Sequence, residues 1–176
     1  MKKILILVTI ILIVGIGYFK AKSQTTATTD IISLSQFDLI PSGAAVSGSN
    51  TALLDSALFL QKFGNPISAT NEQSEIDDLP VSHYTYAGAE AWFMSNKLLG
   101  MNITSSNYVF TLSDGSSTIK VGDHIPVLIN LFPQSWSLMN DMKVFVGLRN
   151  SANEIVDTNL IFEFDSSGTI TSIAIQ

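Results

Sequence analysis

Residues 81–104 read VSHYTYAGAEAWFMSNKLLGMNIT, and they give the clearest β-strand signals in the sequence. Tyr84 and Tyr86 stand two positions apart, and Gly88 and Asn96 mark turns between apolar segments. Alternation with a period of two between turn residues is typical of half-buried β-strands joined by hairpins. The sequence therefore predicts strands over residues 81–87, 90–95 and 98–104, followed by a further strand over residues 107–112.

A helix is expected immediately before these strands. Asn50 or Thr51 can cap its first turn, and the helix runs to about Phe63 with a broad apolar stripe that includes Leu54, Ala57 and Leu58. The segment Gly64-Asn65-Pro66 ends it, since glycine accepts the left-handed cap and proline cannot continue a helix. The acidic stretch over residues 72–78 is predicted to be a loop.

The second half of the chain shows the same order of signals. Asp123 is a suitable N-cap, Pro126 is tolerated in the first turn, and apolar residues continue at helical spacing to Phe132. Pro133 is predicted to stop this helix. Three further strands are predicted over residues 143–149, 155–164 and 169–175.

The spacing of the two halves suggests an internal repeat. The offset from Thr51 to His124 nearly equals the offset from Leu98 to Thr169. A regular period suggests duplication of one supersecondary unit, and the alternative is that α+β proteins repeat such an order by chance. The sequence predicts an α+β fold of two tandem units over residues 50–112 and 113–176. Each unit would be an amphipathic helix packed on an antiparallel sheet of about three to four strands.

Two short patterns carry a family resemblance. A helix ending in Phe63-Gly64-Asn65-Pro66, an acidic loop, and a hairpin with Tyr84-Thr85-Tyr86 together resemble the small BamE-like envelope proteins, as does the helix start at residues 119–125. Two such units in tandem are similar to the architecture of the β-lactamase inhibitor protein. The chain departs from the pattern because it has no cysteine for lipidation and no clear glycine-containing start to its first helix. The resemblance implies an exported, non-catalytic protein-binding or envelope-assembly module, and it transfers no catalytic residue.

The first 23 residues are predicted to be a signal peptide or an N-terminal anchor. Lys2 and Lys3 precede an apolar run over residues 4–19, and Ala21-Lys22-Ser23 offers small residues for cleavage. If the run is retained, it is the only expected membrane contact, with the globular part outside. Residues 24–49 are predicted to be a polar linker, in which residues 30–40 are mixed in polarity and could add an edge strand or pack loosely. In either case the protein is expected to be exported, as a periplasmic or extracellular protein or one anchored by a single N-terminal helix.

Composition excludes several classes of protein. The formal charge of the 176 residues is −6, which argues against nucleic-acid binding because phosphate requires a basic surface. The absence of cysteine excludes disulfides and thiolate metal sites. The carboxylates of residues 72–78 lack the spacing of a helix–loop–helix calcium site. No metal site and no cofactor is predicted.

Catalysis is the alternative function. His83 or His124 could act as the base of a small secreted hydrolase, but the Gly-x-Ser-x-Gly motif of a nucleophile elbow is absent. The leading prediction is therefore a protein without catalytic residues.

Four aromatic residues are candidates for partner binding: Tyr84, Tyr86, Trp92 and Trp136. Aromatic side chains exposed on a rigid sheet make good anchors for a protein partner, although packing in the core is the simpler interpretation of each. The expected partner is another envelope or extracellular protein.

Overall fold

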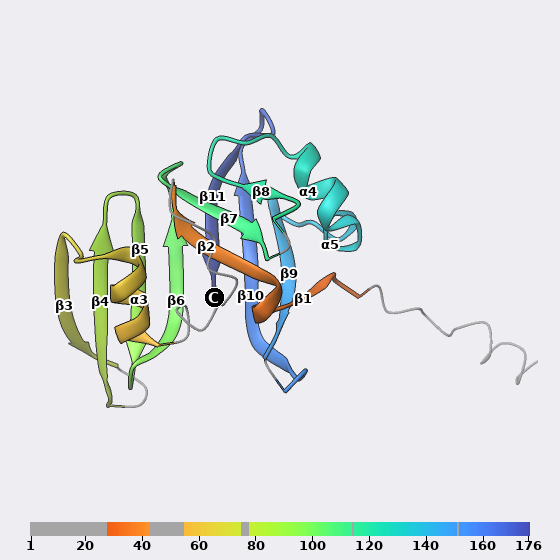
Figure 1. The fold of residues 1–176 in the computed structure, drawn as a ribbon. Helices are drawn as coiled ribbons and strands as arrows, with labels where there is room; N and C mark the ends of the chain where they lie inside the picture. The colour runs from red at the N-terminus through yellow and green to blue at the C-terminus, as the bar shows by residue number, and fades with distance from the viewer. Residues whose placement is uncertain (1–27, 43–54, 75–77, 114, 151) are drawn as a thin grey trace, which may run out of the picture.

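The computed structural model describes residues 28–42, 55–74, 78–113, 115–150 and 152–176 (Figure 1). The predicted signal peptide or anchor over residues 1–23 lies outside these ranges, as do most of the predicted linker and the predicted cap at Asn50 or Thr51. Within the described ranges, no helix combines the length and the apolar character needed to span a membrane.

The main element is an eight-stranded sheet with the order β1-β9-β10-β11-β6-β5-β4-β3. β1 is parallel to β9, and all the other neighbouring strands are antiparallel. The strands comprise β1 (Ile31–Ser33), β3 (Ser68–Gln73), β4 (Pro80–Tyr86), β5 (Ala89–Met94), β6 (Lys97–Ile103), β9 (Lys143–Arg149), β10 (Ile155–Phe164) and β11 (Ile170–Ile175).

A second sheet packs on the half of the main sheet that contains β10 and β11 (Figure 1). It has the order β2 (Phe37–Pro41), β7 (Tyr108–Leu112) and β8 (Thr118–Ile119), and the 3-10 turn η1 (Leu34–Gln36) leads into β2. Phe110 of β7 meets Phe162 of β10 edge to face, with ring centroids 5.7 Å apart. This contact joins the two sheets through fully buried rings.

The helix α3 (Ser56–Phe63) covers the other half of the main sheet (Figure 1). Asp55 caps it by accepting hydrogen bonds from the next turn, and Gly64 ends it with a φ of 79°. Phe59 is fully buried and packs edge to face on Phe93 of β5, at 5.1 Å. The predicted apolar face is incorrect in part, because Leu58 is 42% exposed while Phe59 faces the sheet.

The helices of the second half are short. Pro133 ends α4 (Pro126–Leu131), as predicted, but it also begins α5 (Pro133–Ser137). Asp123 does not cap α4, since the N-cap position is Ile125 and the Asp123 carboxylate accepts a hydrogen bond from the Lys120 amide.

The predicted fold of two tandem helix-on-sheet units is wrong. The chain is mostly β, and its main sheet runs without interruption across residue 112 because β6 pairs with β11. The three-stranded sheet belongs to neither predicted unit. Its β2, inside the predicted linker, is almost wholly buried and pairs with β7. The predicted acidic loop is also shorter than expected, since Glu72 lies in β3.

The main sheet has a covered face and an opposite face, which we call the open face because no described helix or second sheet packs on it. α3, α4, α5 and the three-stranded sheet all pack on the covered face, through rings such as Phe93, Phe162 and Phe164. Cross-strand partners point to the same side of a sheet, and neighbours along a strand point to opposite sides. The alternate positions of β4, β5, β9 and β10 therefore form the open face.

Candidate binding surface

Two of the four predicted binding residues belong to the core. Tyr84 and Tyr86 point to the covered face, where Tyr84 packs against Phe93 at 5.5 Å and Tyr86 packs against Phe59 at 5.9 Å. The Tyr86 hydroxyl donates a hydrogen bond to the Gly64 carbonyl, at 3.1 Å. Burial raises the pKa of Tyr86 to about 12. Tyr86 therefore helps to hold α3 on the sheet, whereas Tyr84 packs beside it on Phe93 of β5.

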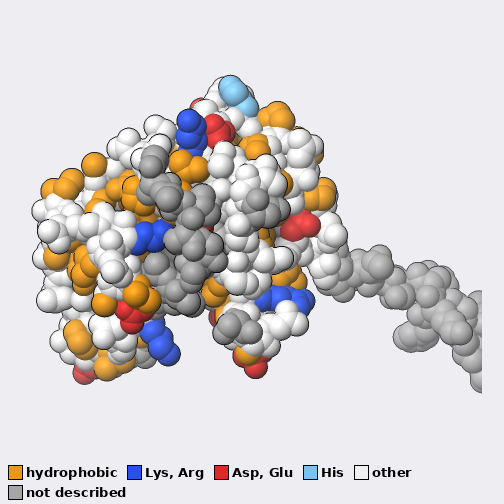
Figure 2. Space-filling model, in the orientation of Figure 1, with side chains coloured by type: hydrophobic (Ala, Val, Ile, Leu, Met, Phe, Trp, Pro, Cys, Tyr) orange, Lys and Arg blue, Asp and Glu red, His pale blue; other side chains and the backbone are white. Residues whose placement is uncertain are grey.

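Trp136 also packs on the covered face. It is partly buried on α5, and its ring lies 5.6 Å from the ring of Phe164. Leu138, Met139 and Met142 follow it and are 39%, 48% and 49% exposed. Figure 2 shows hydrophobic side chains at the surface in the region of α4 and α5. Trp136 is therefore a partly buried residue that precedes a group of exposed apolar side chains. It lies apart from the other three predicted residues.

Trp92 is the predicted residue that lies on the open face. Its partner across the β4–β5 pair is His83, and the two rings stack with centroids 4.8 Å apart and planes 10° apart. Its partner in β6 is Gly100, which has no side chain. The indole therefore stacks on the imidazole on the β4 side. On the β6 side, the directly paired residue has no side chain to contact it.

The open face continues across five adjacent strands as a strip of large and small side chains. We define the open-face strip as Trp92 of β5, Gly100 of β6, Ala174 of β11, Ile161 of β10 and Phe145 of β9. Pairing links Trp92 to Gly100 and links Ala174, Ile161 and Phe145 in series. The partner of Ala174 in β6 is Asn102, which lies two positions after Gly100 and therefore on the same face. Two partly exposed aromatic side chains, Trp92 and Phe145, stand at the ends, and the three residues between them are buried. The two partly exposed rings at the ends are therefore the parts of the strip that a partner can reach.

Sequence reasoning missed Phe145. It lies in the segment Lys143–Arg149, where Val144, Val146 and Leu148 are fully buried. A period of two assigns those three to the core and Phe145 to the other face. That alternation was the signal that could have identified Phe145 as a candidate binding residue. It places an aromatic side chain on the face of the strand that points away from the core.

The two histidines lie in different surroundings. The Nε2 atom of His83 is buried and has no hydrogen-bond partner among the described residues, and the nearest carboxylate oxygen, on Glu90, is 3.9 Å away. His124 is exposed and forms a β-bridge with Thr169. In the part of the chain that the structure describes, no serine hydroxyl bonds to either imidazole, so the geometry gives neither histidine a nucleophile to activate.

Metal binding has no support within the described ranges. No three histidine, cysteine, aspartate or glutamate side chains gather there in a way that could hold an ion. Of the acidic residues considered in the sequence, Glu72 and Asp78 are described, and Glu75 and Asp77 lie outside the described residues.

The described residues form a mostly β protein in which no described helix or second sheet packs on one face of the main sheet. Comparisons with models of protein families, with curated proteins and with solved structures find no match to this chain. The resemblance to BamE-like proteins and to the β-lactamase inhibitor protein therefore remains a prediction.

Proposed function

We propose that this chain is an exported, non-catalytic protein-binding module whose partner, another envelope or extracellular protein, docks on the open face at Trp92. The observation that supports the proposal is the stacking of Trp92 on His83 on that face, beside Gly100. A tryptophan in this setting can bury a large apolar area against a partner.

The stack also lowers the cost of binding. A free tryptophan loses side-chain freedom when a partner fixes it, and that loss reduces affinity. Here the His83 imidazole, itself partly buried, already holds the indole in one orientation. Trp92 thus has the properties of a binding hot spot, which is commonly an aromatic residue at the centre of a contact.

Export is supported by the sequence of the first 23 residues, with their basic start and apolar run. Intact mass of the protein isolated from cells tests it. Loss of residues 1–23, or recovery of the full chain from the membrane fraction, agrees with export. Full chain in the soluble cytosolic fraction contradicts it.

The docking site is tested with a photo-crosslinking amino acid placed at one of two positions in living cells. Thr70 pairs with His83 and lies on the open face, whereas Leu138 is exposed on the covered side beside α5. We expect one envelope protein to be crosslinked from position 70 and not from position 138. A crosslink only from position 138 would place the contact elsewhere.

The energetic test uses that partner in purified form. Trp92→Ala should weaken its binding by about 2 kcal/mol, the usual loss at a hot spot. Leu138→Ala is the matched apolar control and should change nothing. Equal affinity of the Trp92→Ala variant and the unaltered protein, with the fold intact by circular dichroism, would refute the proposal.

A further inference from the structure

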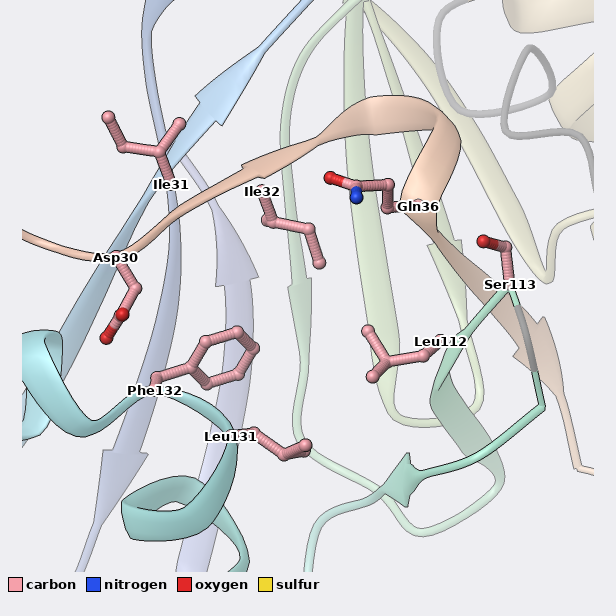
Figure 3. A pocket seen from close by; sticks show the side chains of 8 residues that line it. All are labelled: Asp30, Ile31, Ile32, Gln36, Leu112, Ser113, Leu131 and Phe132. Carbon is pink, nitrogen blue, oxygen red and sulfur yellow. The ribbon is translucent and has the colours of Figure 1, made fainter.

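A cavity of about 380 Å³ lies apart from the open face, between β1, η1, the end of β7 and the end of α4 (Figure 3). Its volume falls in the range of small-molecule sites. Ile32, Leu112, Leu131 and Phe132 supply its apolar walls. Asp30 and Phe132 stand toward one end, and Gln36 and Ser113 toward the other.

Asp30 is held rigidly at the first end. Its amide donates to the Ser135 hydroxyl at 2.9 Å, and its Oδ2 atom accepts from the Ser135 amide at 2.8 Å. Ser135 is itself buried, with 1% of its surface exposed. The other carboxylate oxygen of Asp30 has no hydrogen-bond partner among the described residues, and no described lysine or arginine pairs with it.

The opposite end offers neutral polar groups. The Gln36 side-chain carbonyl accepts from the Ser33 amide at 2.8 Å, and this bond fixes the side chain while its NH₂ group has no bonding partner in the described part of the chain. Figure 3 shows the Ser113 hydroxyl near this end of the cavity. The cavity therefore has one negative charge, an apolar middle and a neutral polar end.

We propose that this cavity binds a small primary amine with a short apolar body. The ammonium group would lie against the free oxygen of Asp30, and the body against Ile32, Leu131 and Phe132. A partly buried carboxylate without a cation is costly to desolvate, and a charge-assisted hydrogen bond from an ammonium group offsets that cost. Anionic ligands are disfavoured by the same charge, because no basic residue is among the described residues that line the cavity.

Three ligands of equal shape test the charge requirement on the full chain. Cyclohexylmethylamine, cyclohexylmethanol and cyclohexanecarboxylate carry a cationic, a neutral and an anionic group on the same ring. In calorimetric titrations the amine should bind at least about tenfold more tightly than the alcohol, and the carboxylate should not bind. Amine binding should weaken as salt is added. Equal binding of all three compounds, or of none, would overturn the proposal.

Two variants locate the site. Asp30→Asn keeps an acceptor for the Ser135 amide but removes the charge, so it should abolish the preference for the amine over the alcohol. Leu131→Trp should fill the cavity and block both ligands. Asp157→Asn, an exposed change on β10, is the matched charge control. Amide NMR spectra verify that each variant is folded, and an unchanged amine affinity in folded Asp30→Asn would refute the site.

A lysine side chain of a peptide also carries a primary ammonium group on an apolar chain, so it could bind in the same way. N-acetyl-lysine methylamide distinguishes the two sources. Binding that is much weaker than that of cyclohexylmethylamine supports a free amine, whereas tighter binding would reassign the cavity to a peptide side chain and overturn this part of the proposal.

Discussion

Lys62 on α3 forms an ion pair with Asp38 on β2, and both side chains are withdrawn from solvent, at 13% and 1% exposed. Asp38 also accepts a hydrogen bond from the Leu39 amide, at 2.9 Å. The pair connects the helix that covers β4 and β5 to the sheet that covers β10 and β11. It therefore links the two layers that lie side by side on the covered face.

Removal of the lysine should be strongly destabilising. Lys62→Met leaves Asp38 buried without its cation, and we expect the free energy of unfolding to fall by about 3 kcal/mol. Urea denaturation measures it, with Lys97→Met as an exposed control. The double variant Asp38→Asn, Lys62→Met should recover part of the loss, since it removes the uncompensated charge. A loss below about 1 kcal/mol in the single variant would show that the pair contributes little.

Tyr86→Phe should alter stability at high pH. The pKa of Tyr86 is raised from 10.0 to about 12 by burial, so the folded state favours the neutral phenol. That contribution is complete below pH 10 and is lost as the pH rises through about 12. The variant should lose about 1 kcal/mol at neutral pH, from the hydrogen bond to Gly64, and should show a shallower alkaline decline. Chemical unfolding at neutral and alkaline pH measures both effects. An identical alkaline slope in variant and parent would contradict the assignment.

Acid should lower the free energy of unfolding, because two carboxyl groups in residues 163–169 have lowered pKa values. The Ser167 hydroxyl, bonded to Asp165 at 2.6 Å, lowers the pKa of Asp165 below its usual 3.8, and Lys143 lowers that of Glu163 below 4.5. A depressed carboxyl pKa stabilises the fold above the unfolded value, and the stabilisation is lost as the pH falls through the folded value. Stability should therefore decline below about pH 4.5.

Asp165→Asn should reduce this acid dependence without changing its sign. Thermal unfolding between pH 7 and pH 3 provides the comparison, and carbon-detected NMR titration of the carboxyl groups gives the two pKa values directly. A pKa of Asp165 at its usual value in the folded protein would show that the Ser167 bond does not persist in solution.

Met142→Gly should stabilise the protein. Asn140 and Lys143 exchange backbone hydrogen bonds around a two-residue turn, in which Asp141 and Met142 have φ values of 49° and 59°. Such a turn favours glycine at its second position because a Cβ atom is strained there. We expect a gain of about 1 kcal/mol in urea denaturation. Met139→Gly, at a position without positive φ, should give no gain, and a gain there instead would point to a different cause.

Six of the eight strands of the main sheet could be predicted, because turn residues separate their apolar segments; β3 was missed, since all its residues are exposed and it carries no apolar alternation. The segments over residues 81–104 and 143–175 alternate and are separated by turn residues, and the observed strands follow those limits closely. β1 and β2 could not be predicted as structure in the same way. Both strands are short and mixed in polarity, and the sequence does not show that Lys62 of α3 forms an ion pair with the buried Asp38.

The binding residues were harder to predict, for a physical reason. A period of two says that Tyr84 and His83 face opposite sides, but it does not say which side α3 covers. Phe59 decides this by packing on Phe93, which places the tyrosines inside and Trp92 outside. The cavity near Asp30 is equally invisible in the sequence, since β1, β7 and α4 meet there only in the folded chain.

The pairing of β6 with β11 has a consequence for the order of folding. The two halves of the main sheet meet through three residue pairs, such as Ile103 with Ile173, that are far apart in the sequence, whereas β4-β5-β6 and β9-β10-β11 each form through short hairpins. Closing a long loop is slow compared with forming a hairpin. Each set of hairpins can therefore assemble early, and the joining of β6 to β11 becomes the slow, late step. The backbone amide hydrogens of the β6–β11 pairing are expected to exchange with solvent sooner than those inside either half of the sheet.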